Sequence, residues 1–245
     1  MCGIAGFCLS PEETGVDARN LSMCLLTQIQ SRGRDATGAA WVNKSDPKTK
    51  KTSITVSKAP VPASRFEQYL GQMGKGTRRA ILHTRWATKG SPQNNLNNHP
   101  IVSGKIVGVH NGVLTNDDAV FNYLAEERKA QVDSEAAFAL LNRTVYEPIE
   151  VLASLQGRAA LAWLDARDKR DLHLARVSES PLAIGQTAMG SLVFASTMTL
   201  LAEACDDAKL EMAWIENIQP MTYLRIRNGE IAELETIGAS LKEIA

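Results

Sequence analysis

Strand-like apolar runs recur along most of the chain, and the helix-like segments between them come in groups rather than one after each strand. The sequence predicts strands at 2–9, 37–43, 52–58, 79–87, 105–113, 158–166, 171–177, 181–186, 191–197 and 221–235. It predicts helices at 16–33, 62–73, 116–130, 133–145 and 147–155, with Asp17 as the first N-cap. Asn228-Gly229 indicates a tight hairpin. This grouping predicts an α+β fold with mostly antiparallel sheets.

Composition and charge narrow the function classes. The 245 residues show no repeat, low-complexity tract or long linker, so we expect a single domain over 1–245. Lys plus Arg equals Asp plus Glu, 27 against 27, which argues against a nucleic-acid partner bound through a bulk basic field. We find neither an apolar run of roughly 18 residues nor a signal peptide, so we expect no membrane partner and a cytoplasmic location.

The four cysteines do not form a metal or disulfide pattern. Cys8, Cys24 and Cys205 are expected to be free thiols packed as small hydrophobic side chains. Cys2 differs because removal of Met1 would leave a thiol and a free α-amino group on one residue. The ordinary pKa of an α-amino group is about 7.7–8.0, so a useful fraction is neutral and can take the thiol proton. Cys2 is therefore a candidate N-terminal nucleophile.

Polar clusters follow several predicted strands, and each has a simple structural interpretation. These clusters occupy 31–38, 83–90, 97–100, 110–112 and 133–135. Asn111-Gly112 is typical of a turn, Arg85 of a surface arginine, and Asp133 of a helix N-cap. His83 and His110 fit hydrogen-bonded core histidines, and His99 fits a loop-shaping role before Pro100. A metal site is not expected, because these three histidines would meet only by chance of the fold.

The same residues together with Cys2 also predict a chemistry. The backbone N–H of Gly112 and the side-chain amide of Asn111 would form an oxyanion hole, in which removal of one donor costs about 3–4 kcal/mol. Arg85 would bind an α-carboxylate in a bidentate manner, and Asp133 would receive an α-ammonium. These groups would hold a free amino acid beside the nucleophile. Both interpretations stay open on the residues alone.

Several stretches in this order resemble the class II glutamine amidotransferases of the N-terminal nucleophile hydrolase superfamily. The similarity is greatest to the glutaminase domain of glucosamine-6-phosphate synthase. The stretches are CGIAGF at 2–7, SRGRDATG at 31–38, HTRWATKGSPQNNLNNHPI at 83–101, VGVHNGVLTN at 107–116 and VDSEAAFALL at 132–141. Further similar stretches at 175–185, 194–201 and 227–234 extend the resemblance nearly to the C-terminus.

The resemblance implies a four-layer αββα sandwich, L-glutamine as substrate, and no cofactor or metal. Cys2 would attack the side-chain amide of glutamine, form a γ-glutamyl thioester and release ammonia. Asn111 and Gly112 would form the oxyanion hole, and Arg85 and Asp133 would hold the two ends of the amino-acid head group. The resemblance also implies that Trp86 and Thr88 lie in a loop that closes over the site, and that Arg32 orders the surroundings of the N-terminal residue.

Two positions depart from the family pattern, and one domain is missing from it. Lys89 replaces the histidine of WATHG in the closing loop, which leaves its effect on closure open. Arg34 precedes Asp35 where the relatives often have Tyr, a change without an interpretation. No synthase domain is recognised within 1–245, so we expect a separate ammonia-accepting synthase. The alternatives are a hydrolase of another γ-glutamyl amide and a non-catalytic regulatory domain. The second is disfavoured because Cys2 and its four partner residues are all present.

Overall fold

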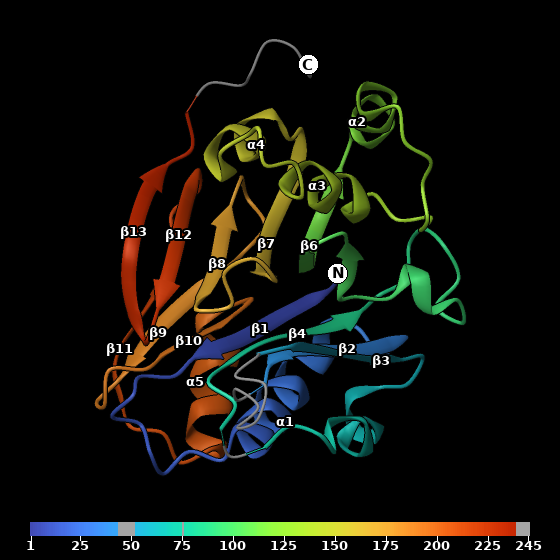
Figure 1. Cartoon of the computed structure of the whole chain (residues 1–245). Coiled ribbons are helices and arrows are strands. Elements are labelled where there is room, and N and C mark those ends of the chain that lie inside the picture. Colours follow the sequence, from blue (N-terminus) through green and yellow to red (C-terminus); the bar gives the residue numbers. More distant parts are fainter. Residues whose placement is uncertain (44–51, 75, 239–245) are drawn as a thin grey trace.

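Two antiparallel sheets lie face to face in the computed structural model, with helices on their outer sides (Figure 1). The model describes residues 1–43, 52–74 and 76–238. The strand order is β11-β9-β10-β1-β4-β2-β3 in one sheet and β13-β12-β8-β7-β6-β5 in the other. All the strand pairs between these elements are antiparallel, which confirms the predicted sheet type.

The bounds of the elements are close to those predicted for most of the chain. The first sheet contains β1 (Gly3–Cys8), β2 (Ala36–Val42), β3 (Ile54–Ala59), β4 (Arg79–Arg85), β9 (Ala183–Thr187), β10 (Leu192–Ala195) and β11 (Met212–Asn217). The second contains β5 (Ile101–Ser103), β6 (Ile106–Leu114), β7 (Gly157–Asp165), β8 (Asp171–Arg176), β12 (Thr222–Arg227) and β13 (Glu230–Thr236). The helices are α1 (Ala18–Ile29), α2 (Asp117–Leu124), α3 (Ser134–Leu141), α4 (Pro148–Ser154) and α5 (Met198–Asp207).

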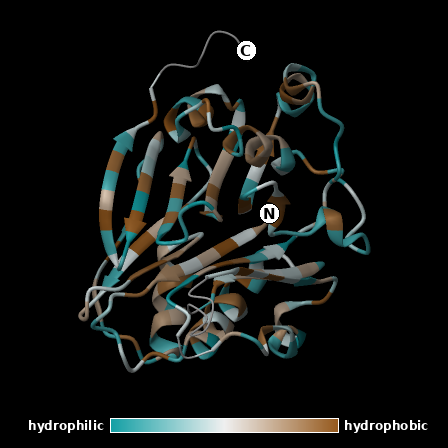
Figure 2. Ribbon diagram, in the orientation of Figure 1, coloured by the Kyte–Doolittle hydropathy of each residue, from teal (hydrophilic) through white to brown (hydrophobic). Residues whose placement is uncertain are grey.

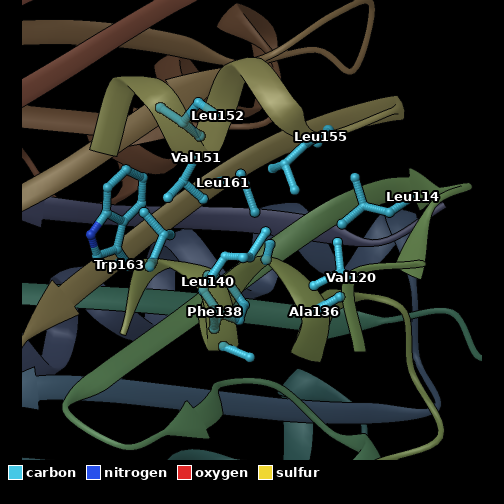
Figure 3. Close-up of a cluster of buried hydrophobic side chains, with 14 of the residues drawn as sticks. Leu114, Val120, Ala136, Phe138, Leu140, Val151, Leu152, Leu155, Leu161 and Trp163 are labelled. Carbon is cyan, nitrogen blue, oxygen red and sulfur yellow. The ribbon is translucent and has the colours of Figure 1, made fainter. Parts of the chain in front are cut away.

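Three hydrophobic cores separate the layers. One lies between the first sheet and the helices α1 and α5. A second, which includes Ile4, Val109 and Phe194, lies between the two sheets. The third lies between the second sheet and α3 and α4, where Phe138, Leu152 and other side chains pack onto the sheet (Figure 3). Three cores of this kind require four layers, so the αββα sandwich is confirmed.

The hydrophobicity of a strand depends on whether the strand is central or at the edge of its sheet. Central strands such as β1 and β7 are mainly hydrophobic, whereas the outer strand β13 mixes hydrophilic and hydrophobic residues (Figure 2). Strands buried on both faces need apolar side chains on both, which is why β1 reads as a continuous apolar run. None of the helices in the described part of the chain is long and apolar enough to cross a membrane.

The start of α1 and the turn between β12 and β13 are each explained by a local residue preference. Asp17 accepts hydrogen bonds from the backbone N–H groups of Arg19 and Asn20, so it caps α1 as expected. Asn228 and Gly229 have φ of 55° and 85° in the turn between β12 and β13. The tight hairpin predicted from this pair is therefore confirmed, because both central residues adopt positive φ.

The helix predicted over 62–73 is wrong. The segment instead forms two 3₁₀ turns, Ala63–Arg65 and Glu67–Leu70. Phe66 and Leu70 are fully buried in the core against α1, so the apolar spacing reflects packing of these turns. A segment this short between Pro62 and Gly71 gains little from helix propagation, and packing decides its form.

Two further differences lie in the helices. α2 ends at Leu124 rather than 130 because Ala125 adopts a left-handed conformation, with φ of 51°. Arg128 then folds back to pair with Asp117. The predictions missed α5 and β11; α5 begins after Thr197, whose side chain accepts from the backbone N–H of Leu200.

We expect Phe194→Ala to lower the free energy of unfolding by about 3–5 kcal/mol, because its ring fills the core between the sheets and is 1% exposed. Urea denaturation measures the change. Leu234→Ala on the outer strand is the control, since this side chain is 64% exposed and should matter by no more than about 0.5 kcal/mol. Equal effects of the two substitutions would contradict the assignment of this core.

Candidate functional site

The predicted site residues converge where the start of β1, the end of β4 and the end of β6 meet. β1 and β4 are antiparallel neighbours with Gly3 opposite Thr84, so the residue before β1 lies beside the residues that end β4. Cys2, Arg85, Gly112 and Asp133 line one common cavity. Residues separated by up to 131 positions in sequence are thus brought together by sheet register.

Cys2 is half-buried, and its Sγ lies 3.7 Å from the carbonyl oxygen of Trp86. Burial raises the pKa of the thiol above its ordinary value, and the contact with the Trp86 carbonyl opposes this only in part. The thiol is therefore protonated near neutral pH, and a nucleophilic role requires a nearby base. Met1 is 69% exposed at the rim of the site.

The segment 32–35 holds both the N-terminus and the loop after β4. Arg32 Nε donates to the carbonyl oxygen of Cys2 at 2.9 Å. Asp35 accepts from the backbone N–H of Ala87 at 2.7 Å. A Cβ on Gly33 would lie 2.4 Å from the carbonyl carbon of Arg85, so only glycine allows this close approach. Arg32 therefore contacts the backbone of Cys2, and its role in ordering the surroundings of the N-terminal residue stays a prediction.

Arg85 is not a surface residue, because its side chain is 3% exposed. Its Nη1 donates to Asn98 Oδ1 at 2.8 Å, and its Nη2 donates to the carbonyl oxygens of Lys89 and Gly90 at 2.5 and 2.8 Å. Burial lowers the pKa of the guanidinium from its ordinary value. An arginine remains charged even so, and its present acceptors are neutral oxygens that a carboxylate can replace.

Asn111 and Gly112 lie inside β6, so the interpretation of this pair as a turn is wrong. Asn111 is 2% exposed, and it lines the larger of two cavities that meet at Cys2. Gly112 has φ of 150°, and a Cβ there would lie 1.8 Å from the carbonyl oxygen of Arg158. Glycine alone fits this backbone conformation, and Gly112 lines the same cavities as Cys2.

Asp133 stands at the first residue before α3, but its side chain makes no capping hydrogen bond. Asp133 therefore has the predicted N-cap position but does not make the capping hydrogen bond expected of it. Asp133 Oδ2 instead accepts from the backbone N–H of Leu114 at 2.6 Å. This contact joins α3 to the end of β6 and turns the carboxylate to the same cavity as Arg85.

Two cavities meet at Cys2 and differ in size and in lining. The smaller, of about 30 Å³, is lined by Arg85, His99, Asp133 and other residues. It is large enough for a water molecule but not for an amino acid. The larger, of about 420 Å³, is lined by Asn111, Gly112, Arg158, Glu179, Pro181 and other residues. An amino acid could enter the smaller cavity only if it widened.

Trp86 and Thr88 lie in the exposed loop after β4 and line both cavities. Trp86 is 57% exposed, which is unusual for a tryptophan and fits a residue at the rim of a site. Lys89 Nζ lies 3.2 Å from Asp117 Oδ2 at the start of α2, and Arg128 pairs with the same carboxylate at 2.9 Å. Lys89 therefore connects the loop to α2.

The three histidines lie close together, which the sequence did not predict, and His99 and His110 line the smaller cavity. His83 and His99 stack with ring centroids 4.2 Å apart, and His83 Nε2 lies 3.2 Å from the carbonyl oxygen of His110. His110 Nδ1 lies 2.8 Å from Ser134 Oγ. Burial lowers the pKa of all three, that of His83 to about 3. Within the described ranges, no group of three His, Cys, Asp or Glu residues is arranged to hold a metal ion.

We expect Gly112→Ala to destabilise the fold by about 1–3 kcal/mol, because the added Cβ collides with the carbonyl of Arg158 and the backbone cannot relax easily at this φ. Thermal and urea unfolding measure this cost. Gly15→Ala is the matched control, since a Cβ on Gly15 meets nothing within 4 Å. Similar stability of the two variants would show that the backbone of β6 is not constrained as described.

Comparison with known proteins agrees with this geometry. A family model described as a glutamine amidotransferase domain matches residues 83–203. Glutamine–fructose-6-phosphate aminotransferase (isomerizing) of Lactococcus lactis is 28% identical over 98% of this chain and 40% of the relative. The enzyme of the same name from Halobacterium salinarum is 30% identical over 96% of this chain and 35% of the relative. The chain thus spans about 40% of the length of the curated relatives it matches.

Solved structures share the fold at lower identity. Glutamine phosphoribosylpyrophosphate amidotransferase from B. subtilis, complexed with ADP and GMP, has a TM-score of 0.76 at 20% identity, covering 97% of this chain and 49% of that one. A structure described as the allosteric regulatory enzyme of purine biosynthesis has a TM-score of 0.75 at 21% identity. Residues 83–203 thus belong to the glutamine amidotransferase domain family, and the chain as a whole shares the fold of these two solved structures.

Proposed function

We propose that this domain hydrolyses the side-chain amide of L-glutamine to glutamate and ammonia, with Cys2 as the nucleophile. The observation that carries the proposal is the convergence of five groups on two adjoining cavities. Cys2 lies where the cavities meet, Arg85 and Asp133 face the smaller one, Asn111 faces the larger, and Gly112 faces both. These are the groups that a free amino acid with an amide side chain requires.

In the proposed reaction, the α-amine exposed by removal of Met1 takes the Sγ proton, and the thiolate attacks the amide carbon. The Asn111 amide and the Gly112 N–H stabilise the oxyanion that forms. The C–N bond then breaks, and the proton held by the α-amine goes to the leaving ammonia. Water hydrolyses the resulting thioester and restores the thiol. The raised pKa of the buried thiol supports the need for such a base.

We propose that the head group of glutamine binds between Arg85 and Asp133. The substrate carboxylate would replace the neutral carbonyl oxygens of Lys89 and Gly90 as acceptors for Arg85 Nη2. This exchange favours a carboxylate because charge-assisted hydrogen bonds are stronger than neutral ones. It also requires the loop that carries Trp86 and Thr88 to move, since both carbonyls belong to its end.

The partner and the location are further parts of the proposal. The relatives' names pair glutamine with amination of a sugar phosphate, so we propose that a synthase receives the ammonia. Supply to a separate synthase chain, the single-domain organisation and a cytoplasmic location stay predictions from the sequence. The larger cavity exceeds what ammonia needs, which favours keeping another γ-glutamyl amide as the alternative substrate.

We expect Cys2→Ala to lower glutamate release from L-glutamine by about 10⁴-fold or more, because removing a nucleophile usually leaves only background turnover. Coupled-enzyme assay of glutamate measures this loss. Cys24→Ala on α1 is the matched control, being a half-buried thiol outside both cavities, and should retain activity. Near-normal turnover by the Cys2→Ala chain would refute the proposed nucleophile.

We expect a chain that keeps extra residues before Cys2 to lose glutamine turnover by about 10²–10⁴-fold, because its α-amine is acylated and cannot act as the base. Its Cys2 thiol should still react with iodoacetamide, but only as the pH rises above the ordinary thiol value of 9.0, because burial raises its pKa. Mass spectrometry of the alkylated N-terminal peptide across pH measures this. Full turnover by the extended chain would contradict the role of the amine.

A panel of γ-glutamyl amides separates the two candidate substrates. We expect the processed chain to have its highest kcat/KM for L-glutamine, since the proposed oxyanion hole and head-group contacts are all used by it. A bulkier γ-glutamyl amide with a higher kcat/KM would favour the alternative, because the larger cavity would then hold its leaving group.

A further inference from the structure

His99 presents an unsatisfied imidazole to the smaller cavity. The residue is 5% exposed, and neither ring nitrogen has a hydrogen-bond partner in the described structure. It lines the cavity together with Cys2, Arg85 and Asp133. A buried polar group without a partner costs about 1–3 kcal/mol, so a ring with two of them is stabilised by an occupant that bonds to it. His99 was interpreted from the sequence only as a loop-shaping residue.

The surroundings hold His99 firmly in this position. Its ring stacks on that of His83. Lys58 Nζ donates to the carbonyl oxygens of Asn98 and Pro100, on either side of His99, at 2.7 and 3.0 Å. A Cβ on Gly38 would lie 2.0 Å from the His99 carbonyl oxygen, so β2 packs directly against this backbone. Side chains fixed in this way carry little entropy cost when a ligand binds.

The ring is neutral at physiological pH. Burial lowers the pKa of His99 well below its ordinary value, and the nearby positive groups Lys58 and Arg85 act in the same direction. A neutral imidazole has one N–H donor and one nitrogen acceptor. It therefore adds a hydrogen-bond donor beside the Arg85 guanidinium without adding charge repulsion.

We propose that His99 is a substrate-binding residue that donates a hydrogen bond to the α-carboxylate of glutamine alongside Arg85. The inference rests on the proposed function, and deepens it by adding a neutral donor to the charged pair Arg85 and Asp133. His99 lines the same cavity as Arg85 and Asp133, so a head group that enters between these two residues as the cavity widens also meets His99. The link through Asn98, which precedes His99 and accepts from Arg85 Nη1, keeps the two donors in a fixed relation.

The test measures L-glutamine binding by calorimetry to the full chain carrying Cys2→Ala, which cannot turn over its ligand. His99→Phe added to this chain keeps a ring to stack on His83 but removes both nitrogens. We expect the Kd for L-glutamine to rise about 10- to 100-fold, as for loss of a hydrogen bond to a charged group. We expect the Tm of the unliganded chain not to fall, because two unsatisfied polar atoms have been removed.

Two conservative variants and one control complete the test. His99→Asn places an amide near the position of Nδ1, and His99→Gln places one near that of Nε2, so recovery of affinity by one of them identifies the donating nitrogen. His173→Phe is the matched control. His173 is also buried and stacked, on Trp163 at 4.9 Å, but it lies on β8 away from both cavities at Cys2. We expect His173→Phe to leave the Kd unchanged.

The possible outcomes separate this inference from the proposed function. An unchanged Kd in the His99→Phe chain would overturn the inference while leaving the proposed function standing. A weaker Kd accompanied by a lower Tm, with no recovery by Asn or Gln, would show a structural role and would also overturn it. If the Cys2→Ala chain itself is folded but does not bind L-glutamine, the proposed function fails and the inference fails with it.

Discussion

The pairing of β1 with β4 is the constraint on which the site depends. Its register sets Gly3 opposite Thr84, so Cys2 falls beside Arg85 and Trp86 without any contact of its own having to place it. A shift of one residue would turn every side chain of β1 to the opposite face of the sheet. The register is secured because β1 is central, with β10 pairing on its other edge.

The second constraint is the burial of charged and polar groups behind this pairing. Arg85 is buried, and three neutral oxygens satisfy it: the side-chain oxygen of Asn98 and the carbonyl oxygens of Lys89 and Gly90. Two of these oxygens come from the loop after β4, so Arg85 holds this loop in place. In the proposed function a substrate carboxylate would displace them, and the loop and the substrate would then compete for one guanidinium.

Three buried histidines, His83, His99 and His110, lie close to that loop. His83 and His110 make hydrogen bonds with fixed neighbours, whereas His99 has none in the described structure. Native proteins seldom leave a buried polar side chain without a partner, so the unpartnered ring of His99 in a cavity supports the proposal that it bonds to the substrate.

Much of the fold could be predicted from sequence because its signals are local. Asp17 caps α1, and Asn228-Gly229 forms its hairpin, as each residue type favours. The turns at 62–73 were misread because packing of Phe66 and Leu70 mimics helical spacing. α5 could have been predicted from Thr197, a typical N-cap, followed by the apolar residues Leu201 and Cys205 at helical spacing. The strand directly before it instead favoured the prediction of sheet structure in this region.

The site was predictable in its residues but not in its contacts. Cys2, Arg85, Asn111, Gly112 and Asp133 lie together. Taken singly, however, Asn111-Gly112 is more typical of a turn and Asp133 of a helix cap. The pairing register of strands that are distant in sequence decides between these alternatives, and this register cannot be predicted from a local sequence pattern. The position of Lys58 and Asn98 around His99 also follows from register, so its unsatisfied ring was visible only in three dimensions.

The most direct measurement of the central claim is covalent labelling by a diazoketone analogue of glutamine, followed by peptide mapping of the purified chain. If Cys2 with a free α-amine is the nucleophile, one analogue is attached per chain, on a peptide that begins at Cys2, and L-glutamine protects against it. Labelling of Cys24 instead, or equal labelling of peptides that still begin at Met1, would contradict the assignment of Cys2 and of its amine.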